Sequence, residues 1–194
     1  ILSRLSETVR ETTALLEKYE FSRACELMYH FAWDDLCDWY LELSKEAFAS
    51  GTADSTKRVL GHVLDQLFRL MHPVMPFITE QMWTTFTGGE SLVIANWPVA
   101  NPAHVDKKAE KLVSELQEII TEVRRFRNDQ GIKTSLKIPG RIVATGEIAD
   151  YASAVAFVVR MELAEITPSA KCEAAGVTIE FDLTGSIDVV AERA

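Results

Sequence analysis

The sequence is poor in the residues that mark secreted and membrane proteins. Its 194 residues include three cysteines, Cys25, Cys37 and Cys172, which form no CxxC pair and are odd in number. This pattern is typical of reduced thiols in a cytosolic protein rather than of a disulfide framework. No apolar run reaches the ~18 residues that a membrane span needs, and the chain does not open on a signal-peptide pattern. We therefore expect a cytoplasmic protein with no membrane partner.

Basic residues are also in deficit, with 20 Lys and Arg against 29 Asp and Glu, a net charge of −9. Proteins that bind nucleic acid usually carry a basic face, because neutralising phosphates supplies much of their affinity. The deficit is reversed locally, where six basic residues accompany the single acid Asp129: Arg124, Arg125, Arg127, Lys133, Lys137 and Arg141. The dipole at a helix end favours cations and would explain the three arginines up to Arg127. It does not explain Lys133, Lys137 and Arg141, which lie beyond the helix end. A local binding patch is therefore as good an interpretation of this segment as a solvated surface.

Motifs for nucleotide binding and nucleophilic catalysis are absent: the sequence contains no GxGxxG, no phosphate loop and no GxSxG. Carboxylates spaced by four share a helix face with one histidine, and the set is His30, Asp34, Asp38, Glu42 and Glu46. A di-iron site would need a Glu-x-x-His pair on each of two helices, and none is present. A solvated acidic face is the favoured interpretation, with a helical metal enzyme as the alternative. We predict no catalytic residue and no metal ligand.

Residues 1–86 show the periodicity of antiparallel helices. The first helix has an apolar stripe at steps of three and four: Leu2, Leu5, Val9, Thr12, Leu16 and Tyr19. The second runs to about Ala49, and Gly51 ends it by tolerating a left-handed backbone. A third helix follows, and Pro73 and Pro76 separate it from a short fourth helix. Four side chains of that last helix are expected on the core side: Phe77, Met82, Trp83 and Phe86.

The rest of the chain mixes helix and strand. We expect a helix over residues 106–129, strands over Leu136–Thr145 and Val177–Leu183, and a helix over Tyr151–Leu163. The predicted fold class is mainly α: an antiparallel helical bundle, residues 1–100, followed by a small α/β subdomain, residues 101–185. Residues 186–194 have a helical pattern and are expected to begin a further helix. Because both ends of the chain read as helix and the first residue is not Met, we expect a fragment of a longer protein.

Aromatic residues are candidates for stacking on unpaired bases, and also for the core. They are Trp33, Trp39, Tyr40 and Trp83. Aromatics at helical spacing are more often buried, and a base stacked on an exposed one is worth ~1–3 kcal/mol. We expect Trp39 and Trp83 inside, and either Trp33 or Tyr40 exposed.

Four blocks of the sequence resemble the valyl-tRNA synthetases, a family of class I aminoacyl-tRNA synthetases. The blocks are Ile1 to Leu5 (ILSRL), Glu20 to Ala24 with Phe31 to Lys45 (FAWDDLCDWYLELSK), His72 to Glu80 (HPVMPFITE), and Val123 to Asn128 (VRRFRN) with Lys137 to Pro139 (KIP). The third block is shared with the isoleucine and leucine enzymes, whereas CDWYLE points to the valine enzyme. Asp129 stands where that family usually has glutamate, and Leu136 where a second lysine is common.

The resemblance implies an anticodon-binding domain that accepts the anticodon loop of valine tRNA and presents the tRNA to a catalytic domain of the same chain. It implies ATP with magnesium for that parent enzyme and no cofactor here, since the family's HIGH and KMSKS signatures and its editing domain are absent. In this class the anticodon bends over the start of the first helix and the far end of the second. The residues implied as tRNA-binding are therefore Arg4, Lys45, Lys57 and Arg58, followed by Arg124, Arg127, Asn128 and Lys137.

Alternatives remain open. The domain of an isoleucyl- or leucyl-tRNA synthetase is the nearest, although the isoleucine enzyme tends to carry a C-terminal zinc-binding cysteine cluster that this sequence lacks. A helical protein-interaction module is an alternative of a different class, favoured by the negative charge and not by the basic segment. Nothing indicates a self-associating helix pair, so we expect a monomer.

Overall fold

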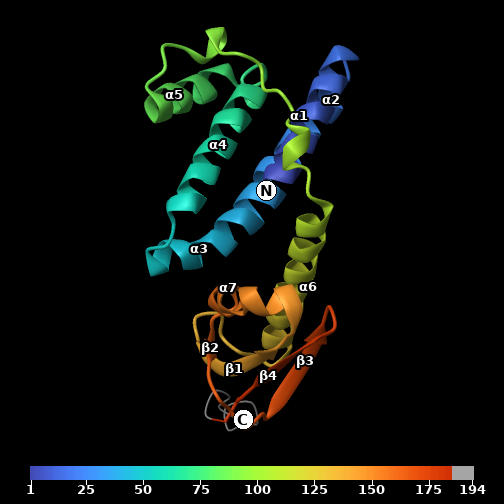
Figure 1. Cartoon of the computed structure of the whole chain (residues 1–194), viewed down its shortest axis with the longest axis vertical. Helices are drawn as coiled ribbons and strands as arrows, with labels where there is room; N and C mark the ends of the chain where they lie inside the picture. Colours follow the sequence, from blue (N-terminus) through green and yellow to red (C-terminus); the bar gives the residue numbers. More distant parts are fainter. Residues whose placement is uncertain (185–194) are drawn as a thin grey trace. The chain divides into compact units, whose positions relative to one another are not determined.

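The computed structural model describes residues 1–184 of the chain, which form two compact units, the first Ile1–Lys107 and the second beginning at Lys108 (Figure 1). The division comes slightly later than the boundary expected between residues 100 and 101. The first unit is helical and the second combines helices with a small sheet, so the predicted fold class is confirmed. The expected further helix, residues 186–194, lies outside the described residues.

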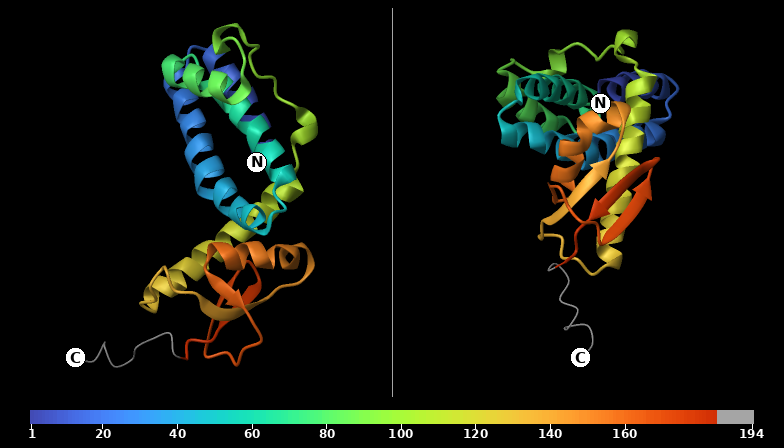
Figure 2. Two further views of the ribbon diagram at one scale, coloured as in Figure 1. Left: turned by 90° about the vertical axis from the view of Figure 1, so that its left-hand side faces the viewer. Right: turned by 60° about the horizontal axis from the view of Figure 1, so that its bottom comes forward.

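The first unit is built from antiparallel helices, which the two views of Figure 2 show from different sides. They are α1 (Leu2–Glu17), then one continuous helix made of α2 (Phe21–His30), η1 (Phe31–Tyr40) and α3 (Leu41–Ser50), then α4 (Asp54–Met71) and α5 (Pro76–Thr87). Gly51 ends α3 with φ 78°, a left-handed value that glycine adopts without strain. Pro76 begins α5, where a missing N–H costs nothing. The core lies between α1, the long helix and α4, and its buried members are Leu5, Val9, Met28, Phe31, Leu36, Val63, Leu67 and Leu70.

The middle of the long helix, η1, is π-helical, with the Leu41 N–H donating to the Leu36 carbonyl five residues earlier. The wider turn changes which side chains face the core. Phe31 and Leu36 are buried five residues apart, and Tyr40 and Leu41 pack next to them. An α-helical spacing had placed Trp39 inside, and it is only half-buried.

Helix α5 packs on α4 by a narrow edge. Trp83 is buried, as expected, and its Nε1 donates to Asp65 Oδ1 at 2.7 Å. The expectation that Phe77, Met82 and Phe86 face the core is wrong, since all three are exposed and Phe77 is 90% exposed. Only Thr79 and Trp83, one helical turn apart, are buried on this helix.

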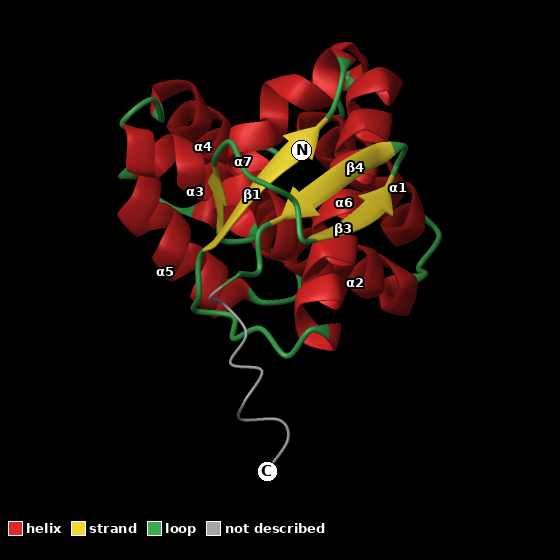
Figure 3. Ribbon diagram, turned by 90° about the horizontal axis from the view of Figure 1, so that it is seen from below, coloured by secondary structure: helices red, strands yellow, loops and turns green. Residues whose placement is uncertain are grey.

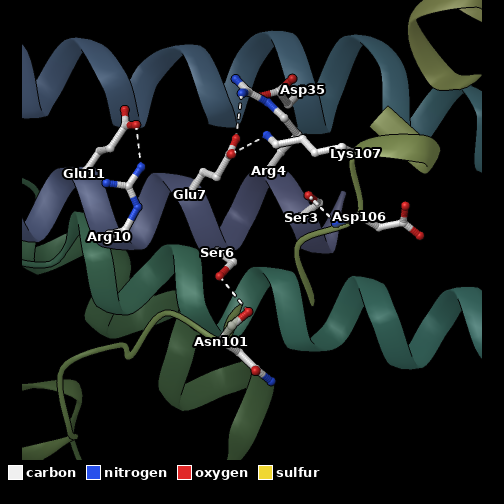
Figure 4. Close-up of polar contacts among 10 residues, drawn as sticks. All are labelled: Ser3, Arg4, Ser6, Glu7, Arg10, Glu11, Asp35, Asn101, Asp106 and Lys107. Carbon is white, nitrogen blue, oxygen red and sulfur yellow. Dashed lines mark hydrogen bonds and ion pairs between the residues drawn. The ribbon is translucent and has the colours of Figure 1, made fainter. Parts of the chain in front are cut away.

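An extended segment, residues 95–107, returns along α1 and includes the short helix η3 (Pro102–His104). It follows η2 (Leu92–Ile94). Its hydrogen bonds with α1 run from Trp97 Nε1 to Thr13 Oγ1 (2.9 Å), from Ser6 Oγ to the Asn101 carbonyl (2.9 Å) and from the Asp106 N–H to Ser3 Oγ (3.1 Å). As the segment advances its partners move back along α1, so the two lie antiparallel; Figure 4 shows the last two bonds.

The second unit contains α6 (Lys107–Asp129), β1 (Ile138–Val143), η4 (Gly146–Tyr151), α7 (Ala152–Val158), β2 (Met161–Leu163), β3 (Ala170–Ala174) and β4 (Val177–Phe181). The strand order is β2-β1-β4-β3, with β1 and β2 parallel and the other pairs antiparallel. The sequence predicted β1 and β4. It did not predict β2, which has three residues, or β3, whose sequence AKCEA lacks β-branched residues.

Helices α6 and α7 cover one face of this sheet (Figure 3). Val177, Ile179 and Phe181 alternate inward along β4, and the Phe181 ring stacks on Phe126 of α6 with centroids 4.7 Å apart. The opposite face is polar. There Arg141 pairs with Glu180 across the β1–β4 ladder.

Candidate nucleic-acid interface

Arg4, the leading candidate for contacting RNA, lies within a cluster of charges at the start of α1 (Figure 4). Its Nε is 3.2 Å from Asp35 Oδ2 and its Nη1 is 3.5 Å from Glu7 Oε2. Lys107 also pairs with Glu7. Two carboxylates therefore orient the guanidinium, whose side chain remains about half exposed. A guanidinium has five N–H groups, so Arg4 keeps donors for a ligand while these pairs hold it in place.

Lys45 lies in the middle of α3, and Lys57 and Arg58 lie in the first turns of α4, on either side of the turn at Gly51. Lys45 pairs with Glu42, and Lys57 lies 3.9 Å from Asp54. Arg58 is exposed and has no ion pair in the described part of the chain. The structure does not bring Arg4 to this group. Its partner Asp35 precedes Lys45 by ten residues of continuous helix, a distance of about 15 Å.

Exposed aromatic rings lie on the long helix and at the turn before it. Tyr29 and Trp33, one turn apart, are 57% and 55% exposed and stack in parallel, with centroids 6.4 Å apart and planes 2° apart. Tyr19 and Phe21 form an edge-to-face pair at the α1–α2 turn, and both are exposed. Sequence reasoning considered Trp33, did not consider Tyr29 and Phe21, and wrongly placed Tyr19 on the apolar stripe of the first helix, which ends at Glu17 before this residue. The useful signal was the four-residue spacing of Tyr29 and Trp33, which makes two side chains neighbours on a helix surface.

Arg127 of α6 is buried, with 6% of its surface exposed. Its Nη2 donates to the carbonyls of Lys133 (3.0 Å) and Leu136 (2.7 Å), and its Nη1 to the carbonyl of Arg160 (3.5 Å). Burial, and then the charge of Arg160, lower the pKa of Arg127 below the usual arginine value. The guanidinium thus ties the loop after α6 to the segment before β2.

A hollow of about 420 Å³ opens beside Arg127, with a polar lining of Arg124, Asn128, Thr134 and Arg160. Val158 and Val159 form an apolar wall. The loop after α6 contributes Ile132 and Thr134 to the lining, and Lys133 and Lys137 lie exposed on the same loop. We call the hollow together with these two lysines the cationic hollow. Arg160 was not predicted, because it is distant in sequence from the other members. Arg125 and Arg141 do not contribute, since they pair with Glu122 and Glu180.

The acidic row on the long helix does not make a metal centre. His30 Nδ1 lies 2.7 Å from Asp34 Oδ2, and both side chains are exposed. Within residues 1–184 no three His, Cys, Asp or Glu side chains gather in a way that could hold a metal ion. Among the helices of that same range, none has the length and apolar character needed to cross a membrane.

Comparison with known proteins gives consistent matches. A family profile described as the anticodon-binding domain of tRNA ligase matches residues 1–142. The chain is 44% identical to a valine–tRNA ligase of Nocardia farcinica, 46% to one of Streptomyces avermitilis and 45% to one of Mycobacterium leprae. Each match covers 100% of this chain and 22% or 23% of the relative, so the chain spans less than a quarter of the length of these curated relatives. The chain belongs to the family of anticodon-binding domains of tRNA ligases.

Proposed function

We propose that this anticodon-binding domain recognises the anticodon stem-loop of valine tRNA. The observation that carries the proposal is similarity over the whole chain, at 41% to 46% identity, to proteins named valine–tRNA ligase. That similarity favours the valine enzyme over the isoleucine and leucine enzymes. A purely protein-binding module is disfavoured by the family and by the exposed aromatic and cationic side chains.

Different side chains of the domain would contact the bases and the phosphates of the anticodon loop. Single-stranded loops are usually read by splaying out bases that stack on aromatic rings, and Tyr29 and Trp33 offer such rings on a rigid helix. Lys45, Lys57 and Arg58 supply charges for the backbone, which position the RNA without reading its sequence. Arg4, held by Asp35 and Glu7, has the fixed orientation that contact with a base edge requires.

The wider role belongs to a longer chain. The domain would hold the tRNA for a catalytic domain of the same polypeptide, which would use ATP and magnesium to join valine to the tRNA in the cytoplasm, as a monomeric enzyme. The exposed apolar side chains of α5, Phe77, Ile78, Met82 and Phe86, offer a surface for that domain, because apolar patches of this kind mark protein interfaces.

The test is binding of the chain to a valine tRNA transcript and to a transcript that differs only in its anticodon. We expect tighter binding to the native anticodon, and weaker binding of both as salt rises, because counterion release contributes to affinity. An isoleucine tRNA transcript serves as the comparison for the alternative family member. Equal affinity for all three transcripts would contradict the proposed specificity.

A further inference from the structure

The cationic hollow is an organised site and not a loose collection of surface charges. The three carbonyls that accept from Arg127 belong to Lys133, Leu136 and Arg160. The Arg160 carbonyl also accepts from the Ile138 N–H at 3.2 Å, which anchors the residue next to Lys137. One buried side chain therefore sets the backbone positions of Lys133, Lys137 and Arg160 at the same time.

Arg160 has a strained backbone. Its φ is +53°, a left-handed value that side chains other than glycine rarely adopt. Glycine would fill the position without strain, so the turn between α7 and β2 does not require an arginine for its geometry. Such outliers gather at binding sites, where surrounding contacts hold them in place.

The charged side chains that line the hollow are all cationic: Arg124, Arg127 and Arg160. Arg160 and Arg127 are close enough for the charge of one to lower the pKa of the other. In the described range no carboxylate pairs with Lys133, Lys137 or Arg160, and the nearby acid Asp129 acts on Arg125. Cations held close together repel one another. An anion bound among them would relieve this repulsion.

The side chains that line the hollow suit a phosphate group. Arginine donates to phosphate with two parallel N–H groups, and lysine adds a mobile point charge. Asn128 and Thr134 add neutral hydrogen-bonding groups, while Val158 and Val159 provide an apolar wall for an attached sugar. A volume of about 420 Å³ exceeds what phosphate alone would fill and falls within the range of pockets that hold small organic ligands.

We infer that the cationic hollow binds a phosphate of the tRNA backbone outside the anticodon, with Arg160, Arg124, Lys133 and Lys137 as its charged contacts and Arg127 as the positioning residue. The inference rests on the proposed function for the identity of the RNA. It assigns the second unit a role of its own, which is to hold the RNA backbone regardless of base sequence.

The experiment uses the full 194-residue chain and a double variant, Arg160→Gly with Lys133→Gln. Glycine removes the charge and also the backbone strain, so the thermal midpoint should stay equal or rise. Affinity for the valine tRNA transcript should fall about tenfold, and the slope of log affinity against log salt should become shallower by about one, because the contact with one phosphate is lost. The preference for the native anticodon should be unchanged.

The matched control is Lys111→Gln with Lys171→Gln. It removes the same charge from exposed lysines of the same unit, and Lys171 lies on β3, at the sheet edge opposite β2. This control should retain wild-type affinity. A second variant, Lys133→Gln with Lys137→Gln, leaves Arg160 intact and should reproduce the loss if the first variant folds poorly.

The outcomes separate this inference from the proposed function. Wild-type affinity in both hollow variants would overturn the inference, even if the wild-type chain prefers the native anticodon. Loss of affinity in the variants combined with no anticodon preference in the wild type would support the inference and reject the proposed specificity. Inorganic phosphate tested alone shows whether free phosphate, and not RNA, is the ligand. If phosphate shifts the amide signals around Arg160 while the variants bind tRNA normally, the hollow binds free phosphate. The inference about RNA is then overturned.

Discussion

Within residues 1–184 the guanidinium of Arg127 donates only to carbonyl oxygens, and these belong to three residues of the second unit. A surface arginine beside it, Arg125, pairs with Glu122 and is largely exposed. Substituting Arg127 and substituting Arg125 therefore remove different kinds of interaction. Arg127 supplies the donor for the Leu136 carbonyl and a second donor for the Lys133 and Arg160 carbonyls, which also accept from backbone N–H groups. Arg125 contributes one solvent-screened ion pair.

Arg127→Met should lower the free energy of unfolding by about 1–3 kcal/mol, because the Leu136 carbonyl loses its donor and the Lys133 carbonyl loses one of two. The matched variant Arg125→Met should cost less than about 1 kcal/mol, as exposed ion pairs do. Urea denaturation followed by circular dichroism measures both. Equal losses in the two variants would show that the bonds of Arg127 do not stabilise the loop.

Asp65 is a second single residue of interest, because its contribution to the free energy of unfolding depends on pH. Burial by itself raises its pKa, but hydrogen bonds from Trp83, Arg69 and Gln66, with the charge of Arg69, outweigh burial and bring the pKa below the ordinary 3.8. A carboxyl group whose pKa is lower in the folded than in the unfolded state stabilises the fold above the unfolded value. That stabilisation is lost as pH falls through the folded value.

Asp65→Asn should therefore lower the free energy of unfolding at pH 7 by about 1–2 kcal/mol, since bonds to a charged acceptor are replaced by bonds to a neutral one. The difference between variant and wild type should shrink as pH drops below about 4. Urea unfolding at neutral and acidic pH gives both values, with Asp129→Asn as an exposed control. A difference that is the same at both pH values would mean that the charge of Asp65 is not involved.

At the scale of the element, the long helix Phe21–Ser50 carries two faces that its π segment helps to set. Phe31 and Leu36 pack inward at a spacing of five. Tyr29 and Trp33 remain outside and stack on each other. Under the proposed function, these two rings are the ones on which unpaired bases would stack.

Tyr29→Ala and Trp33→Ala should each weaken binding of the valine tRNA transcript by roughly tenfold, within the ~1–3 kcal/mol that a stacked base contributes. Stability should change little, because both rings are exposed. Fluorescence anisotropy and thermal denaturation measure the two quantities. Phe157→Ala, which removes an exposed ring from the second unit, is the control. If all three variants bind equally, the pair has no part in RNA recognition.

At the scale of the whole molecule, a chain with net charge −9 binds a polyanion only where local charge outweighs the average. The cationic hollow of the second unit is such a place. In the first unit the cations at Arg4 and at the α3–α4 turn are largely matched by carboxylates, so binding there depends more on oriented side chains than on net charge. The surrounding acids disfavour RNA elsewhere on the surface. Binding of tRNA should thus be more sensitive to salt than the net charge suggests. Measuring the affinity for the valine tRNA transcript at two salt concentrations tests this directly.

The sequence by itself determined most of the helices, two of the strands and the fold class. Gly51, Pro76 and Gly88 set helix ends because their backbone preferences are local, and Val177, Ile179 and Phe181 showed their strand by alternation. The tertiary structure alone decided that Phe77 is exposed, that Arg127 is buried on carbonyls, and that Arg160 joins Arg124 around one hollow. Periodicity and turn preferences act over a few residues and can be read along the chain, whereas burial and the meeting of distant charges depend on which elements pack together.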